Sequence, residues 1–182
     1  PRVLDFGVAR VDGKAVSPEG VQVRAVIDVG VEDVMFIGNA HPTEQHIWTW
    51  GGETTTPITS EPGMHAAVRS ADTTVVLSAD LQSPLPVANY RSAGSSGVIE
   101  SFADSPSITP SVTLLPGDDD NLRIAVLLPS GSATNAPLPV LLDPYGGPHG
   151  QRVQCAQGAF RESQWWADQG FGVVVVDGRG TP

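Results

Sequence analysis

The turn that follows residue 144 contains a side chain that could take part in chemistry. The sequence Y-G-G-P occupies residues 145–148, directly after the apolar stretch 139–142 and Asp143-Pro144. A tyrosine hydroxyl donates a hydrogen bond, and glycines beside it tolerate unusual dihedral angles and close approach. Tyr145 is therefore a candidate donor to a bound group. The alternative is a buried tyrosine that only closes the end of a strand.

A second polar turn, Asp177-Gly178-Arg179-Gly180, comes directly after the apolar run 173–176. An apolar run without alternation is typical of a parallel strand that is covered on both faces. Open α/β sheets place their binding sites at the carboxyl ends of such strands. We nevertheless expect Asp177 and Arg179 to pair with each other or with backbone groups, and we assign neither a catalytic role.

The remaining reactive side chains do not form a recognisable site. His41, His46 and His65 lack the i, i+4 spacing of a helical metal site, so they are predicted to be hydrogen-bonding residues of turns and sheets. The acidic run 118–120 lacks the rest of a calcium loop, and a solvated turn is the better interpretation. Cys155 has no catalytic signature around it. The sequence therefore predicts no metal and no cofactor.

Composition narrows the class of protein. Ten Lys and Arg against twenty Asp and Glu give a net charge of −10, which would repel nucleic acid and anionic membranes. The single cysteine permits no internal disulfide, and a cytoplasmic location is the default. The longest apolar runs are too short to cross a bilayer. The chain opens on Pro1 and stops in a loop at Pro182, so we expect a piece of a longer protein that could have lost a targeting signal.

Two different kinds of element must position these residues. Up to residue 115 short β-type runs alternate with turns, which is typical of a sandwich, a barrel or a propeller. Comparable strands recur at intervals of about 40 to 45 residues, which is the length of a four-stranded propeller blade. Residues 103–120 are rich in Pro, Ser and acid and predict a domain boundary. Beyond it, residues 138–177 predict a strand, a helix that Gly170 ends, and a second strand parallel to the first.

Several motifs carry a resemblance to a known family. P-V-L-L-D-P-Y-G-G-P-H-G-Q-R (139–152) and W-W-A-D-Q-G-F-G-V-V-V-V-D-G-R-G-T-P (165–182) resemble the opening of the hydrolase domain of prolyl oligopeptidase family serine peptidases. F-I-G-N-A-H-P-T-E-Q-H-I-W (36–48) and I-T-S-E-P-G-M-H-A-A (58–67) resemble the last propeller blades of the dipeptidyl-peptidase-IV-like branch. The resemblance extends over residues 20–182 and is weakest at 80–120.

The resemblance implies a fold and an activity. Residues 1–115 would be the C-terminal antiparallel blades of a β-propeller, and residues 116–182 the first part of an α/β-hydrolase domain. The parent would be a serine peptidase that cleaves short peptides, with a homo-oligomer possible. The family uses the tyrosine of the Y-G-G-P turn as a donor to the oxyanion formed during acyl transfer, and Tyr145 matches that position. Its substrate-binding residues are not identified.

The catalytic triad is expected outside these 182 residues. An α/β-hydrolase needs a nucleophile elbow, usually G-x-S-x-G, followed by an acid and a histidine. The sequence contains no such elbow, and no histidine follows His149. None of Glu32, Glu44 and Glu53 is assigned to binding a substrate amino terminus. The fragment alone is therefore predicted to be inactive. Two alternatives remain. The parent could hydrolyse acylated amino acids or esters, or the chain could be a non-catalytic interaction fragment.

Overall fold

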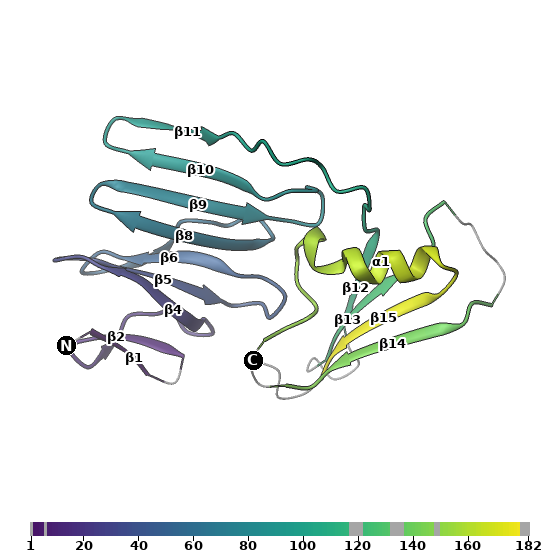
Figure 1. The fold of residues 1–182 in the computed structure, drawn as a ribbon. Helices are drawn as coiled ribbons and strands as arrows, with labels where there is room; N and C mark the ends of the chain where they lie inside the picture. Colours follow the sequence, from purple (N-terminus) through teal and green to yellow (C-terminus); the bar gives the residue numbers. More distant parts are fainter. Residues whose placement is uncertain (1, 6, 117–121, 132–136, 148–149, 179–182) are drawn as a thin grey trace. The chain divides into compact units, whose positions relative to one another are not determined.

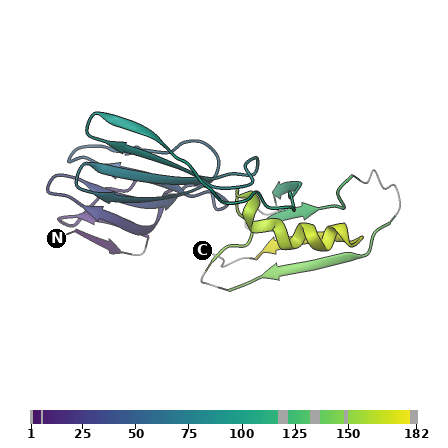
Figure 2. The same cartoon turned by 45° about the horizontal axis from the view of Figure 1, so that its top comes forward.

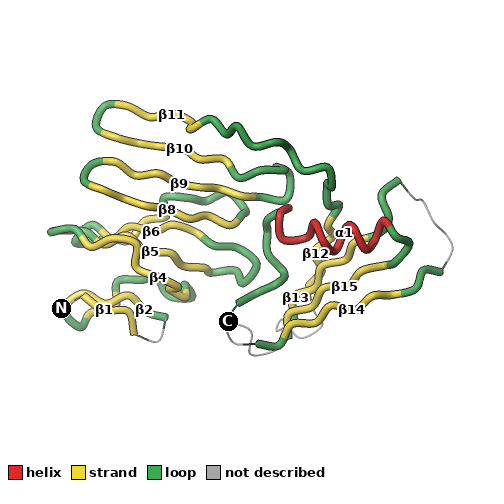
Figure 3. The backbone as a smooth tube through the Cα atoms, in the orientation of Figure 1, coloured by secondary structure: helices red, strands yellow, loops and turns green. Residues whose placement is uncertain are grey.

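A computed structural model of the chain describes residues 2–5, 7–116, 122–131, 137–147 and 150–178. The described residues form two compact units. One comprises residues 1–78 and 86–102, and the other residues 79–85 and 103–182. Figure 3 shows how strongly strands dominate the described part, with α1 as its α-helix. None of the described helices is long and apolar enough to cross a membrane.

The first unit consists of three sheets built from consecutive strands (Figure 1). A three-stranded sheet contains β1 (Arg2–Asp5), β2 (Val8–Val11) and β3 (Lys14–Ala15). The next sheet contains β4 (Gln22–Val29), β5 (Val34–Asn39), β6 (His46–Trp50) and β7 (Thr55–Pro57). The third contains β8 (Met64–Ser70), β9 (Thr73–Ala79), β10 (Val87–Ser92) and β11 (Ser95–Ile99).

The apolar run at 34–37 forms a buried strand inside its sheet. The run at 34–37 is almost fully buried in β5, which pairs antiparallel with β4 on one side and β6 on the other. Phe36 is completely buried in a core cluster against which Trp48 and Trp50 pack. The Gly51-Gly52 turn leads from β6 to β7, and Gly52 has a φ of 86°, which favours glycine. The predicted succession of short strands joined by turns is confirmed.

Arg69 on β8 links the two four-stranded sheets of the first unit. The Arg69 Nε donates a hydrogen bond of 2.5 Å to the Asp28 carboxylate on β4. Its terminal nitrogens bind both carboxylate oxygens of Asp33, the residue directly before β5. The side chain of Arg69 is largely buried, with 13% exposed, whereas Asp28 is 39% exposed. The guanidinium therefore joins two carboxylates that come from a different sheet.

This cluster predicts a pH dependence of the stability of the first unit. The hydrogen bond from Arg69 holds the pKa of the Asp28 carboxyl below its ordinary value of 3.8. A group with a lowered pKa in the folded state stabilises the fold above its unfolded pKa, and this contribution disappears as the pH falls through the folded pKa. We expect Arg69→Met to destabilise the first unit at pH 7, and the difference from wild type to shrink below about pH 4. Denaturant unfolding at pH 7 and at pH 3 measures it.

The exposed Arg91 on β10 offers a matched control. Arg91→Met makes the same change of side chain without touching either carboxylate, and should leave the unfolding midpoint close to wild type at both pH values. A difference between wild type and Arg69→Met that stays constant from pH 7 to pH 3 would contradict the assigned role of Asp28.

The second unit is a mixed sheet with α1 packed on one face. It contains β12 (Val112–Pro116), β13 (Arg123–Leu127), β15 (Gly172–Asp177) and β14 (Val140–Tyr145), in that order. β14 and β15 are parallel, and α1 (Arg161–Asp168) lies between them in sequence, preceded by a 3-10 turn at Gln157–Phe160. Figures 1 and 2 both show α1 along the sheet. The predicted strand-helix-strand unit is confirmed.

Apolar and polar contacts both fix α1 on the sheet. Phe160 and Ala167 are fully buried in a cluster with Ala125, Val173 and Val175 of the strands beneath. The fully buried Gln164 accepts the backbone N–H of Ser111 at 2.9 Å and donates to the Leu128 carbonyl at 3.0 Å. Gly170, with a φ of 101°, ends the helical stretch as predicted.

The two compact units divide at residue 102/103, earlier than the predicted boundary at 115/116. The reason is that β12 pairs antiparallel with β13 over its whole length, so residues 112–116 belong to the mixed sheet. Residues 79–85 also belong to the second unit, because the backbone carbonyl of Asp80 accepts the N–H of Gln157 at 2.7 Å and Leu81 packs against the core. The Pro-rich composition of residues 103–120 indicated the change of unit but not its exact position.

Candidate functional site

The candidate site lies at the carboxyl ends of the parallel strands β14 and β15. Tyr145 ends β14 and is in register with Asp177, which ends β15. Because side chains alternate along a strand, Asp143, Tyr145 and Asp177 lie on the same face as the buried Val173 and Val175. The fold therefore brings Tyr145 and Asp177, which begin the two polar turns found in the sequence, to the carboxyl ends of adjacent strands, on the face that carries α1.

The Tyr145 ring folds back over the turn that follows it. A Cβ atom added to Gly147 would lie 2.6 Å from the Tyr145 hydroxyl oxygen and 2.8 Å from ring carbon Cζ, which is closer than real atoms approach. A Cβ atom added to Gly146 would meet nothing within 4 Å. Neither glycine has a positive φ, so close approach rather than an unusual dihedral angle explains why Gly147 suits the turn. Pro148 lies outside the described residues.

This contact predicts that the two glycines respond differently to the same substitution. Gly147→Ala should displace the Tyr145 ring, whereas Gly146→Ala should leave it in place. The chain contains two tyrosines, Tyr90 and Tyr145, so an NMR spectrum with ring-labelled tyrosine contains two sets of signals. We expect Gly147→Ala to move the Tyr145 signals and to leave those of Tyr90 unchanged. Equal effects of the two alanines on Tyr145 would contradict the contact.

Asp177 is the best satisfied carboxylate at this edge. It is 3% exposed, and both of its oxygens lie 3.0 Å from the backbone nitrogen of Arg152. Its Oδ2 also accepts the N–H of Val153 at 2.8 Å. The sequence predicted that Asp177 pairs with Arg179 or with backbone groups, and the backbone contacts are confirmed. Arg179 and Gly180 lie outside the described residues.

Arg152 links the same segment to β14. Its Nη2 donates to the Asp143 carboxylate at 2.6 Å, and both side chains are about one third exposed, at 39% and 33%. Sequence analysis did not identify either residue as part of the site. The i, i+2 spacing of Asp143 and Tyr145 on one strand was the available signal, because it places both side chains on one face.

The Tyr145 hydroxyl is a donor that no other described residue occupies. The carboxylates of Asp143 and Asp177 are both occupied, whereas the Tyr145 hydroxyl makes no hydrogen bond to another described residue. The Tyr145 side chain is partly exposed, so a bound group can reach it. A neutral phenol can donate one hydrogen bond to an oxygen that carries negative charge.

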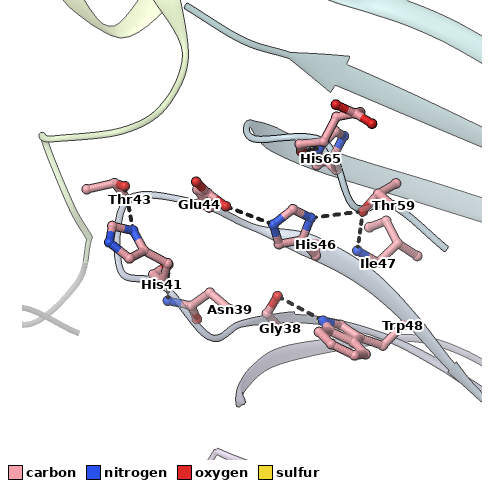
Figure 4. Close-up of polar contacts among 11 residues, drawn as sticks. Gly38, Asn39, His41, Thr43, Glu44, His46, Ile47, Trp48, Thr59 and His65 are labelled. Atoms are coloured by element: carbon pink, nitrogen blue, oxygen red, sulfur yellow. Dashed lines mark hydrogen bonds and ion pairs between the residues drawn. The ribbon is translucent and has the colours of Figure 1, made fainter. Parts of the chain in front are cut away.

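A second group of polar side chains lies in the first unit (Figure 4). His46 Nε2 lies 3.1 Å from a Glu44 carboxylate oxygen, and His46 Nδ1 lies 3.3 Å from the Thr59 hydroxyl. A hydroxyl, an imidazole and a carboxylate in a row could relay a proton. However, the Thr59 oxygen also accepts the backbone N–H of Ile47 at 3.0 Å, which fixes it to the sheet.

The other two histidines are also held within the sheets. His65 is buried, contacts the Ser78 hydroxyl and the Glu61 carbonyl, and stacks on His46 with ring centroids 5.3 Å apart. His41 Nδ1 lies 2.8 Å from the Thr43 hydroxyl. The prediction that the histidines form hydrogen bonds in turns and sheets is confirmed. In the part of the chain that the structure describes, no three His, Cys, Asp or Glu side chains gather as metal ligands, and Asp118–Asp120 fall outside that part.

Comparison with known proteins adds two findings. Residues 118–182, which include both polar turns, match the sequence model of the family described as X-Pro dipeptidyl-peptidase (S15 family). Among solved structures, the chain is similar to dipeptidyl peptidase 4 from Porphyromonas gingivalis, with a TM-score of 0.74 and 16% sequence identity. No curated protein sequence matches the chain.

The structural similarity covers 96% of this chain and 27% of the Porphyromonas gingivalis chain, so it spans about a quarter of that protein. At this identity it shows the fold, and the consecutive antiparallel sheets of the first unit are consistent with a propeller-like β-rich segment. Both findings support the predicted resemblance to dipeptidyl-peptidase-IV-like serine peptidases.

Proposed function

We propose that the chain is a segment of a dipeptidyl or oligopeptidyl serine peptidase that cleaves short peptides. The carrying observation is the Tyr145 phenol at the carboxyl end of β14, which makes no hydrogen bond to another described residue and lies in a region that matches the X-Pro dipeptidyl-peptidase family. In this proposal the first unit contributes C-terminal propeller blades. The mixed sheet and α1 form the first part of an α/β-hydrolase domain of the prolyl oligopeptidase type.

The chemistry assigned to Tyr145 is stabilisation of an oxyanion. A serine hydroxyl would add to the scissile carbonyl carbon, while a histidine takes the serine proton and passes it to the leaving amine as the C–N bond breaks. Water would then hydrolyse the acyl-enzyme. The carbonyl oxygen carries negative charge in both tetrahedral intermediates, and the Tyr145 hydroxyl would donate to it. The serine, the acid and the histidine lie outside residues 1–182 in this proposal.

Two features of the chain agree with this assignment. The net charge of −10 does not favour a nucleic-acid partner. Short peptides are the proposed substrates because the chain resembles a peptidase family. The chemistry needs no metal or cofactor, because a positioned serine, a base and oxyanion donors suffice. A cytoplasmic location and a homo-oligomer belong to the same proposal.

The test compares the full-length protein with the 182-residue chain. We expect the full-length protein to release dipeptides from X-Pro amides and to lose activity with a serine-directed fluorophosphonate. The isolated chain should show no turnover above background. Turnover by the isolated chain that the fluorophosphonate blocks would overturn the placement of the triad.

The choice of substrates separates the proposed activity from its alternatives. Full-length protein that prefers acylated amino acids or simple esters to X-Pro amides would instead be an acyl hydrolase of the same fold. Full-length protein that neither turns over any of these substrates nor reacts with the fluorophosphonate would overturn the peptidase proposal and favour a non-catalytic interaction role.

A further inference from the structure

The buried carboxylate of Asp177 binds the backbone of the segment that follows the Tyr145 turn. Its oxygens receive the backbone N–H groups of Arg152 and Val153 at 2.8 to 3.0 Å. Hydrogen bonds to an ionised acceptor are stronger than neutral ones, and a carboxylate buried to this degree needs them. Asp177 thus fixes the chain at the point where it leaves the turn.

Tyr145, the residue before the turn, is also held by the end of β15. The Tyr145 carbonyl accepts the backbone N–H of Gly178 at 3.1 Å, and Tyr145 and Asp177 are in register across the parallel pair. The Arg152 side chain adds a link to Asp143, two residues before Tyr145. Tyr145 and Arg152 therefore both form hydrogen bonds with residues at the carboxyl end of β15.

The attachment extends into the hydrophobic core. Val153 is 1% exposed and belongs to the cluster formed by Phe160, Ala167 and the strand residues. A displacement of the Arg152–Val153 backbone would therefore be resisted by packing as well as by the carboxylate. The Tyr145 ring rests on Gly147, so its direction depends on the position of Gly147.

We propose that Asp177 is a positioning residue for Tyr145. It acts through the backbone N–H groups of Arg152 and Val153 and through the pairing of β15 with Tyr145, and it does not itself contact the substrate. The assignment rests on the proposed function only in so far as Tyr145 is the oxyanion donor. The placement of the ring can be tested without any activity.

Asp177→Asn is the direct test. An asparagine keeps the size of the side chain, but it replaces one acceptor oxygen by an NH₂ group, which cannot accept the N–H groups that point at it. In the 182-residue chain with ring-labelled tyrosine, we expect Asp177→Asn to shift or broaden the Tyr145 signals and to leave those of Tyr90 in place. Unchanged Tyr145 signals in a folded Asp177→Asn chain would overturn the proposal.

Asp168→Asn is the matched control in the same unit. The Asp168 carboxylate also accepts a backbone N–H, that of Ser130 at 2.8 Å, and it binds Gln164 on α1 rather than the Tyr145 loop. We expect Asp168→Asn to lower stability without moving the Tyr145 signals. If both variants move them equally, the effect is a general loss of structure and the proposal fails.

A measurement on the wild-type chain covers the case in which Asp177→Asn does not fold. The Arg152 and Val153 amides should exchange with deuterium as slowly as amides within β15, because the carboxylate occupies them. Exchange of these two amides at the rate of free peptides would overturn the proposal.

Kinetics of the full-length protein then connect placement with catalysis. We expect Asp177→Asn to lower kcat about 10- to 100-fold, since a small misplacement of a catalytic group can cost this much, while KM stays within about threefold. A kcat equal to wild type despite a moved Tyr145 signal would overturn the positioning role. If Tyr145→Phe also leaves kcat unchanged, it is the proposed function that fails, and the tyrosine spectra still report whether Asp177 places the ring.

Discussion

Tyr145→Phe in the full-length protein should lower kcat about 100- to 1,000-fold, which is the loss expected from removing one oxyanion donor. The hydroxyl binds the oxygen of the scissile group most strongly when that oxygen carries charge, so the effect falls on the transition state and KM should change little. The substitution removes one oxygen atom and keeps the ring that rests on Gly147. The measurement is steady-state kinetics on an X-Pro amide, with thermal unfolding to show that the variant is folded.

Tyr90→Phe provides the matched control for this prediction. Tyr90 lies on β10 in the first unit, and its ring also packs on a glycine, because a Cβ atom added to Gly97 would lie 3.0 Å from ring carbon Cε1. Removal of its hydroxyl should leave kcat close to wild type. Activity of Tyr145→Phe within about threefold of wild type would show that Tyr145 only closes the strand.

The strands and the parallel unit were predictable because their signals are local. The unbroken apolar run 173–176 identified β15 as a central strand, and β15 pairs with β13 on one side and β14 on the other. In the described residues α1 covers the face of Val173 and Val175, whereas Val174 and Val176 on the other face are only partly buried. Gly170 marked the end of the helical stretch through its φ of 101°. Residues Val34–Ile37 were recognised as a buried strand for the same reason, since no polar residue interrupts them.

The contacts that complete the site were not predictable, because they join residues far apart in sequence. Nothing local in Arg152 shows that its backbone N–H binds a carboxylate 25 residues later. The position of β12 depends on its pairing with β13, and the pairing partner cannot be read from the composition of residues 103–120. Tyr145 and Asp177 were each found separately, whereas their register across β14 and β15 required the structure.

The largest expected effect on stability is that of Phe160→Ala, which should cost the second unit about 3 to 5 kcal/mol. Phe160 is completely buried where the 3-10 turn passes into α1, in a core cluster that also contains residues of β13, α1 and β15. The alanine removes the ring and leaves a cavity that the surrounding strands can only partly close. Amide hydrogen exchange should show the loss in β13 and β15.

Phe102→Ala makes the same change at a position that is 91% exposed, so the two variants differ in burial and not in chemistry. An exposed phenylalanine contributes little apolar area on folding, and its removal should change stability by less than about 0.5 kcal/mol. Because Phe160 lies in the second unit, amides of β5 in the first unit should keep their protection in Phe160→Ala if each unit is stabilised by its own core. A cost for Phe160→Ala no larger than that for Phe102→Ala would contradict a core centred on α1, and with it the anchoring of Val153 on which the placement of Tyr145 depends.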